Sequence, residues 1–319
     1  MKNRLFASVM ALAAVAVVLS LVPALAAGQG PRTQADCPTG DIELFHRCAI
    51  EKAKSFTPPR RPDGRPDLHG FWVRATGPGS PSHSLEEGSE PLAFIIQGRD
   101  PRTAKVNVIV ESADRMIPYQ PWAAAKRREH LVNLFAPTKR EHVDPDDRCF
   151  LNGAPRQVYG GGFQVLQVPG NVLFLFENSH AYRIIPMDGR PHVADNIKLW
   201  VGDSRGRWEG NTLVVEVTNQ NDQTWLDSHG SFHSDALRVV ERFTLIDADT
   251  IHYEASIEDP KVFTRPWKIA MPLNRSGEDG VELWEEACHE GERSVEHMLE
   301  GGRLLREKGV TGIHTHDVK

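Results

Sequence analysis

The residues best suited to proton chemistry lie in one polar loop, residues 219–234, which contains Asp222, Trp225, His229 and His233. Histidine titrates near neutral pH, so we predict that His229 or His233 acts as the general acid or base of an active site. Asp222 could orient the histidine, and Trp225 could form an aromatic wall of the site. A structureless loop of this length in a compact domain is usually functional or mobile. Ordinary surface histidines are the alternative.

The second possible role of this loop is to bind a divalent metal ion. His229 and His233 stand four residues apart, a spacing that suits metal binding on a helix, with Asp222 as a further ligand. The intervening Gly230-Ser231-Phe232 is not a helical sequence. We therefore expect no cofactor and keep the metal as a minor alternative.

The neighbouring segments could supply further groups. Asp203 or Glu241 could orient the histidine, and Arg205 or Arg183 could stabilise developing negative charge. Tyr253, on an apolar stripe of the following segment, is a predicted ligand contact. If Glu241 points inward, burial would raise its pKa and make it a proton-transfer candidate.

Each of these residues also has a purely structural interpretation. Arg205 could form a cross-strand ion pair with Glu216 on a solvated face, and Arg183 could pair with Asp188. Glu241 could simply be exposed, as most glutamates are. Cys288-His289 resembles a nucleophile beside a base, but adjacent residues on a strand point to opposite faces, and a disulfide is the better interpretation for Cys288.

The segments that must position these residues are predominantly short strands. From Gly162 onward, apolar and polar residues alternate in runs separated by turn residues such as Pro169-Gly170-Asn171 and Gly210-Asn211. No helical segment separates them, so a parallel α/β sheet is excluded. We predict a mainly β fold, an antiparallel meander that closes into a lipocalin-like or calycin-like barrel, with a sandwich as the alternative. The predicted strands cover residues 68–73, 92–97, 104–110, 163–168, 172–177, 182–186, 198–208, 212–218, 236–246, 250–258, 267–273 and 281–288.

The hairpin over residues 198–218 allows a prediction of register. With Gly210-Asn211 as a two-residue turn, Trp208 faces Leu213 and Arg205 faces Glu216. Trp208, Leu213, Val215 and Val217 then share an apolar face, while Asp203, Arg205, Arg207, Glu216 and Thr218 share a polar one. The polar face lies either on the solvated outside or along a ligand cavity.

The N-terminal part predicts export. Lys2 and Arg4 precede an apolar run that ends in a small-residue cleavage site, so residues 1–27 are predicted to be a signal peptide. Residues 28–66 are predicted to be a flexible segment with a helix over 41–54. Residues 67–319 are predicted to form one barrel domain with an inserted helix over 119–134 and a short terminal helix over 298–308. We expect a periplasmic or secreted protein, with no membrane insertion after cleavage.

Cysteine usage and charge fit that compartment. The four cysteines, Cys37, Cys48, Cys149 and Cys288, form an even set that suggests two disulfides, and three pairings are possible. Cys37–Cys48 is the easy local pair, which would leave Cys149–Cys288. The formal net charge of −6 provides no general cationic face, so we expect no nucleic-acid partner.

Two motifs carry a family resemblance. PDGRPDLHGFW (residues 62–72) and GDSRGRWEGNTLVVE (residues 202–216) resemble those of a large family of secreted bacterial proteins. Within the first, Gly70-x-Trp72 is similar to the first strand of lipocalins. The resemblance implies export and a barrel, and it brings no settled activity with it.

These observations predict a function of one of two classes. The first is an exported barrel enzyme that performs acid–base chemistry, such as isomerisation, hydration, cyclisation or hydrolysis, on a small, largely apolar organic molecule. The second is a non-catalytic periplasmic carrier of a hydrophobic small molecule, because barrels of this kind commonly bind apolar ligands. No nucleophile elbow, phosphate-binding loop, His-Glu-x-x-His or dinucleotide motif is present, which argues against several common enzyme classes.

Overall fold

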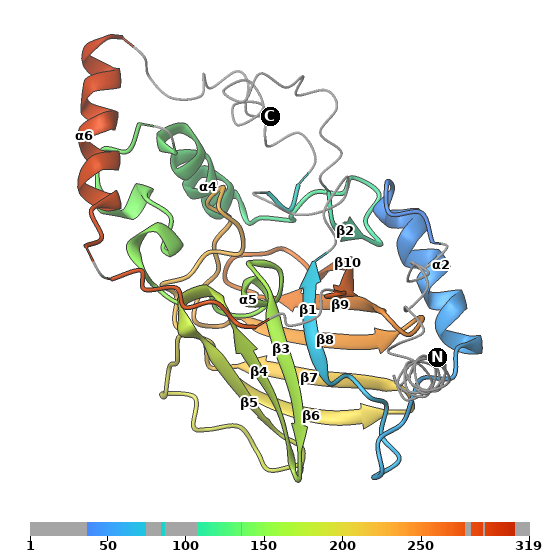
Figure 1. Cartoon of the computed structure of the whole chain (residues 1–319). Coiled ribbons are helices and arrows are strands. Elements are labelled where there is room, and N and C mark those ends of the chain that lie inside the picture. The colour runs from blue at the N-terminus through green and yellow to red at the C-terminus, as the bar shows by residue number, and fades with distance from the viewer. Residues whose placement is uncertain are drawn as a thin grey trace, which may run out of the picture. The chain divides into compact units, whose positions relative to one another are not determined.

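The strands form one antiparallel sheet that curls into a nearly closed barrel (Figure 1). The computed structural model describes residues 37–74, 84–86, 107–134, 136–277, 282–289 and 291–309. The sheet order is β5-β4-β3-β1-β10-β9-β8-β7-β6, with β2 paired to β10. The strands are β1 (Gly70–Arg74), β2 (Ile109–Val110), β3 (Phe163–Val168), β4 (Asn171–Phe176), β5 (Tyr182–Pro186), β6 (Asp203–Glu209), β7 (Thr212–Thr218), β8 (Arg238–Leu245), β9 (Thr250–Glu258) and β10 (Trp267–Arg275).

The barrel closes between β5 and β6, the two ends of the hydrogen-bonded order. Side chains bridge this seam: the Arg183 guanidinium of β5 donates to Ser204 Oγ of β6 over 3.1 and 3.3 Å. Gly206 lets Ile185 approach closely, since a Cβ at Gly206 would lie 2.7 Å from Ile185 Cγ2. Side-chain contacts therefore complete the barrel where the strand ladder ends.

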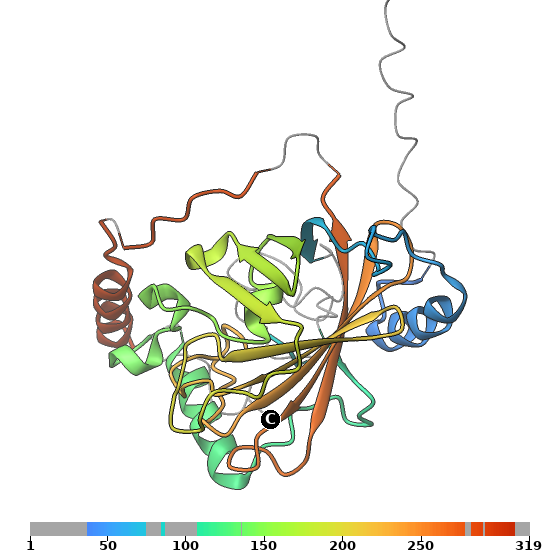
Figure 2. The same cartoon turned by 90° about the horizontal axis from the view of Figure 1, so that it is seen from below.

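Alternation along each strand fills the barrel with apolar side chains. Figure 2 shows the strands β3–β5 facing the strands β6–β10 across this core. The largest buried side chains include Trp72, Phe163, Phe174, Phe243 and Tyr253. Polar residues occupy the alternate positions, which is the pattern of an antiparallel sheet with one buried face.

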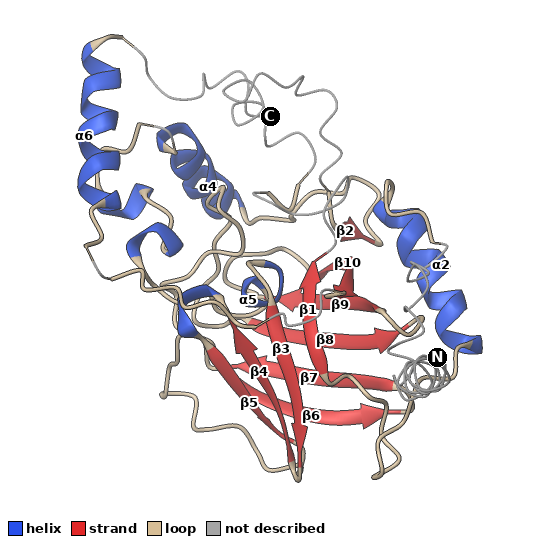
Figure 3. Ribbon diagram, in the orientation of Figure 1, coloured by secondary structure: helices blue, strands red, loops and turns tan. Residues whose placement is uncertain are grey.

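Helices lie around the barrel (Figure 3). They are α2 (Ile42–Ser55), α4 (Pro121–Asn133), α5 (Arg156–Tyr159) and α6 (Ser294–Glu307), with 3₁₀ turns η2 (Arg140–His142), η3 (Asp146–Arg148) and η4 (Asn178–His180). Asp41 caps α2 by accepting hydrogen bonds from the amides of Glu43 and Leu44. The helix packs against β9 and β10 through Ile42, Phe45 and Ala49.

The two ends of the barrel differ in their connections. Tight turns join β3 to β4, β6 to β7 and β8 to β9 at one end. At the other end, longer segments follow β1, β4, β7 and β9, and α5 leads into β3. Because all pairings are antiparallel, the residues at these positions meet around one rim.

The structure confirms the predicted fold class and the register of the β6–β7 hairpin. Trp208 lies opposite Leu213 and Arg205 lies opposite Glu216. Some predictions of extent are wrong. Before β6, Leu199 forms only an isolated bridge with Gln220, and residues 200–202 have no strand structure. Of the strand predicted over 104–110, only β2 is formed among the described residues, and residues 282–288 have no strand structure. The predicted strand over 92–97 lies outside the described residues.

Two disulfides are present, Cys37–Cys48 and Cys149–Cys288, as predicted. They leave no free cysteine and suggest an oxidising, extracytoplasmic compartment. Among the described residues, no helix is long and apolar enough to cross a membrane. The predicted signal peptide lies outside the described residues.

Candidate functional site

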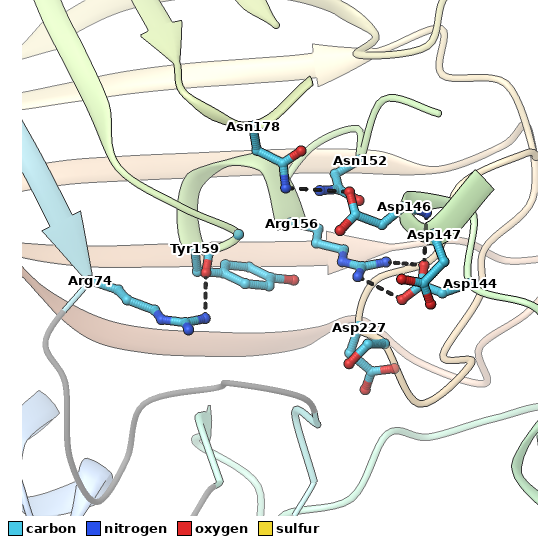
Figure 4. Close-up of a pocket in the computed structure, with 11 residues that line it drawn as sticks. Arg74, Asp144, Asp146, Asp147, Asn152, Arg156, Tyr159, Asn178 and Asp227 are labelled. Carbon is cyan, nitrogen blue, oxygen red and sulfur yellow. Dashed lines mark hydrogen bonds and ion pairs between the residues drawn. The ribbon is translucent and has the colours of Figure 1, made fainter. Parts of the chain in front are cut away.

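A polar cleft of about 420 Å³ opens at the rim with the long connections (Figure 4). Its walls come from the end of β1, from η3, α5 and η4, and from the loop that follows β7. It is lined by Arg74, Asp144, Asp146, Asp147, Asn152, Arg156, Tyr159, Gly160, Asn178, Asp227 and Ser228. We call it the polar cleft.

A buried glutamine joins two walls of the polar cleft. Gln220 accepts a hydrogen bond from the Ala154 amide over 2.9 Å and donates one to the Ala154 carbonyl over 2.8 Å. Gly153 makes this approach possible: its φ is +70°, and a Cβ there would lie 2.5 Å from Gln220 Oε1. The loop after β7 is thereby fixed to the segment that carries Asn152 and Arg156.

Arg156 and Asp144 form a bidentate ion pair at the back of the cleft. The two guanidinium–carboxylate distances are both 2.7 Å, and both residues are buried. Burial alone would lower the pKa of Arg156, but the Asp144 carboxylate outweighs it and raises that pKa. The pair is a fixed wall of the cleft rather than a proton carrier.

Asp147 is the group in the cleft that can exchange protons near neutral pH. Partial burial, followed by the carboxylates of Asp144 and Asp146, raises the pKa of Asp147 to about 6. Its side chain lies at the mouth of the cleft, where the cleft wall covers one side of it and the rest is open to solvent. A carboxyl group with this pKa can donate a proton and also accept one at physiological pH.

Asn152 is buried in the cleft, and its side-chain amide makes no hydrogen bond with the described residues. The residue is 2 % exposed, yet neither Oδ1 nor Nδ2 has a hydrogen-bond partner among the described residues. Buried amides are nearly always paired, so an unpaired one indicates a position that a ligand or a bound water completes. Across the cleft, Asn178 Nδ2 donates to Asp146 Oδ1 over 3.3 Å.

Asp227 fixes the loop that closes the cleft. Its carboxylate accepts hydrogen bonds from the amides of His229, Ser231 and Leu85 and from the Ser231 hydroxyl. Burial opposes its ionisation, but Arg127, His229 and the Ser231 hydrogen bonds together lower its pKa. Asp227 is therefore an ionised structural anchor.

The cleft has an excess of negative charge, since its lining contains more aspartates than arginines. Arg74, at the end of β1, donates to the Tyr159 carbonyl over 2.7 Å and places a positive group at the opposite side from Asp147 (Figure 4). This arrangement favours neutral or cationic molecules over phosphates and other anions.

Three of the predicted site residues meet inside the barrel, away from the polar cleft. Arg183 contacts the Glu241 carboxylate over 2.5 and 3.2 Å, and the Tyr253 hydroxyl donates to Glu241 over 2.9 Å. Burial raises the pKa of Tyr253, which keeps the hydroxyl protonated. The sequence suggested an Arg183–Asp188 pair; in the structure Asp188 pairs with Arg190 instead. This interior cluster is Arg183, Ser204, Glu241 and Tyr253.

The two predicted histidines, His229 and His233, are buried in the loop after β7 and do not line the polar cleft. His233 is buried and bonded at both nitrogens, to Thr224 Oγ1 over 2.7 Å and to the Ser234 carbonyl over 2.9 Å. Burial lowers its pKa, so it stays neutral. Trp225 stacks on His130 with ring centroids 4.8 Å apart, and buried His229 lies in the turn that Asp227 anchors. Asp222 is exposed and accepts a hydrogen bond from Gln223, and the clusters of potential metal ligands found among the described residues do not include it or the two histidines.

Asp203 and Arg205 lie together at the barrel seam. Arg205 Nη1 donates to Asp203 over 2.7 Å, and His192 Nδ1 lies 2.8 Å from the same carboxylate. The suggested Arg205–Glu216 pair is not formed, because Glu216 pairs with Arg238 on β8 over 2.8 Å. The polar face of the hairpin is the outer face, since Leu213, Val215 and Val217 are buried in the core.

Most residues of the polar cleft were not predicted as site residues from the sequence. The acidic run Asp144–Asp147 is visible there, but nothing local indicates that Asn152 is buried without a partner. Arg74 and Asp227 are far from it in the chain. A weak signal was available, because the loop 219–234 was predicted as functional and does supply Asp227 and Ser228 to the cleft wall.

Comparison with known proteins gives no match: no family model fits the chain, and no curated protein or solved structure shows significant similarity to it.

Proposed function

We propose that the protein is an exported enzyme that performs general acid–base chemistry on a small, neutral, hydroxyl-bearing molecule in the polar cleft. The observation that carries this proposal is the presence, in one cavity, of a carboxyl group that titrates near neutral pH and a buried amide without a partner. Asp147 supplies proton transfer, and Asn152 binds the substrate.

The lining supports a polar substrate in place of the largely apolar molecule expected from the sequence. The Asn152 amide can donate to one hydroxyl oxygen and accept from another. Protonated Asp147 can give its proton to an oxygen atom of the substrate, and ionised Asp147 can take one from a hydroxyl group, a carbon atom or water. Arg74 stabilises negative charge that develops on the substrate. Isomerisation, hydration and hydrolysis all use these steps.

The experiment compares the wild type with Asp147→Asn. Purified protein is incubated with a panel of neutral sugars, polyols and amino alcohols, and products are identified by mass spectrometry. We expect turnover with an ionisation near pH 6, and a loss of about 10²- to 10⁴-fold in Asp147→Asn. The matched control is Asp195→Asn, at an exposed aspartate outside the cleft, which should retain full activity. Equal turnover by Asp147→Asn and the wild type would contradict the proposal.

The second candidate, a non-catalytic carrier, has its own observation. A cavity of about 530 Å³ beside the Cys149–Cys288 disulfide is lined in part by Phe150, Leu151 and Trp200. The rings of Phe150 and Trp200 lie 4.8 Å apart, so this cavity suits an apolar or aromatic ligand. An apolar compound that co-purifies unchanged, and is lost in Trp200→Ala, would favour the carrier.

A further inference from the structure

A second polar cluster lies on the outside of the barrel, beneath α2. It joins His46 of α2 to His252 and Glu254 of β9, with Glu111 directly after β2. His46 Nδ1 lies 3.1 Å from His252 Nε2, and one ligand atom from each of His46, His252 and Glu254 lies within 4.8 Å of the others. Both histidines are 2 % exposed.

The hydrogen bonds of the histidines turn two ring nitrogens toward each other. A carboxylate only accepts, so the 3.2 Å contact between His46 Nε2 and Glu111 places the proton on Nε2 and leaves a lone pair on Nδ1. The opposite ring nitrogen of His252, Nδ1, faces Glu254 at 3.8 Å. If His252 holds its proton there, two lone pairs face each other at 3.1 Å. If it holds its proton on Nε2, it donates a hydrogen bond to His46 Nδ1, and its own unprotonated Nδ1 lies 3.8 Å from the Glu254 carboxylate.

The geometry brings two imidazole nitrogens and a carboxylate oxygen within 4.8 Å of one another, which is the arrangement that a bound cation needs. We propose that His46, His252 and Glu254 bind a divalent transition-metal ion of the zinc class. Two imidazole nitrogens and a carboxylate oxygen are ligands that such ions prefer. The Glu111–His46 contact then has the form of a carboxylate–histidine–metal triad, in which the outer carboxylate fixes the tautomer of the ligand.

The surrounding groups are compatible with the ion. Lys268 Nζ lies 2.9 Å from Glu111 and 3.7 Å from Glu254, so it balances both carboxylates. With a metal bound, Glu254 turns to the ion and Lys268 keeps its contact with Glu111. Both disulfides hold all four cysteines, so no thiolate of this chain competes for the metal.

The site would fasten α2 to the barrel wall. The Cys37–Cys48 disulfide joins α2 only to residues just before it, over a sequence separation of 11. A metal held by His46 and His252 links residues that are 206 positions apart. Because the folded chain binds the ion and the unfolded chain does not assemble the site, binding raises stability.

The test uses full-length, tag-free protein stripped with a chelator, then titrated with Zn²⁺ by calorimetry and analysed for bound zinc. We expect one Zn²⁺ per chain, a rise in Tm on binding, and the visible spectrum of nitrogen- and oxygen-bound Co²⁺ when Co²⁺ replaces it. Stoichiometric binding should be lost in His46→Gln and in His252→Gln. Glu111→Gln should weaken it by about 10- to 100-fold.

The controls separate the site from general effects. His180→Gln, at an exposed histidine of η4, should bind like the wild type. Far-UV circular dichroism checks that each variant is folded. Glu254→Gln, at a partly exposed position, provides a third ligand variant if a histidine variant does not fold. A wild type that binds no zinc, or folded ligand variants that bind it as tightly as the wild type, would overturn the proposal.

Discussion

The interior cluster and the polar cleft both bury charged side chains, but they differ in how completely those groups are paired. Inside the barrel, Arg183 and Tyr253 both bond to Glu241, and Ser204 accepts two further hydrogen bonds from the guanidinium. In the cleft, Asn152 has no partner among the described residues and Asp147 is exposed at the mouth. Complete pairing indicates a structural role, because a paired group has nothing left to offer a ligand.

Glu241→Gln should have the largest effect, because it leaves the Arg183 charge unpaired in the barrel core. We expect a loss of about 3–5 kcal/mol in the free energy of unfolding, measured by urea denaturation. The control Glu258→Gln, on an exposed side chain of neighbouring β9, should cost about 0–1 kcal/mol. The double variant Arg183→Met/Glu241→Leu should recover much of the loss. If Glu241→Gln and Glu258→Gln were equally stable, the structural role assigned to the interior cluster would be wrong.

Removing the Cys149–Cys288 disulfide tests how the cleft wall is held. Cys149 follows η3 directly, and the bond closes a sequence separation of 139 residues. Replacing both cysteines by serine should lower the free energy of unfolding by about 2–4 kcal/mol, measured by thermal or urea unfolding. The same change at Cys37 and Cys48 should cost less, because that loop is much shorter. The reverse order would show that chain entropy does not dominate.

The side-chain amides of Gln220 and Asn152 are both buried near the polar cleft, but only that of Gln220 is paired. Gln220 makes two hydrogen bonds to Ala154, whereas Asn152 makes none with its side chain. Gln220→Ala should cost about 1–3 kcal/mol of unfolding free energy, and Asn152→Ala less than about 1 kcal/mol. Chemical denaturation measures both losses. The two variants can be compared directly because Gln220 and Asn152 are similarly buried. A larger loss for Asn152→Ala would indicate that its amide is structurally paired after all.

The smallest effect is the pH dependence from Asp147. Its folded pKa of about 6 lies above the ordinary value of 3.8, so between these pH values the folded chain holds a proton that the unfolded chain has released. Stability therefore falls as pH rises through this window, and Asp147→Asn should remove that fall. Glu129 provides the opposite sign: Lys139 and His142 lower its pKa to about 2, so its contribution is lost as pH falls from 4.5 toward 2. A pH series of urea midpoints measures both slopes.

The alternation of residues was sufficient for much of the fold. The Gly210-Asn211 turn correctly predicted the cross-strand partners of Trp208 and Arg205. A two-residue turn permits only one register between the strands that it joins. The predicted strands over 182–186, 212–218 and 250–258 coincide with β5, β7 and β9. The helix expected over 119–134 appears as α4, with Pro121 in its first turn.

The candidate site could not be predicted in the same way. Period-two alternation places Glu241 on the face opposite Val240, but it does not say that this face lies inside a closed barrel beside Arg183. The acidic run Asp144–Asp147 is readable in the sequence. The ion pair of Asp144 with Arg156, and the burial that contributes most to raising the pKa of Asp147, are tertiary effects.

What the sequence determined by itself is local: the strands, the turns, the hairpin register and the even set of cysteines follow from neighbouring residues and from steric limits on the backbone. What only the tertiary structure decided is which polar groups find partners. Arg183 pairs with Glu241, and Asp188 pairs with Arg190. His46 contacts His252, which is 206 residues away in the sequence. The side-chain amide of Asn152 has no hydrogen-bond partner among the described residues. Pairing of this kind depends on distances across the closed barrel, and no local pattern encodes them.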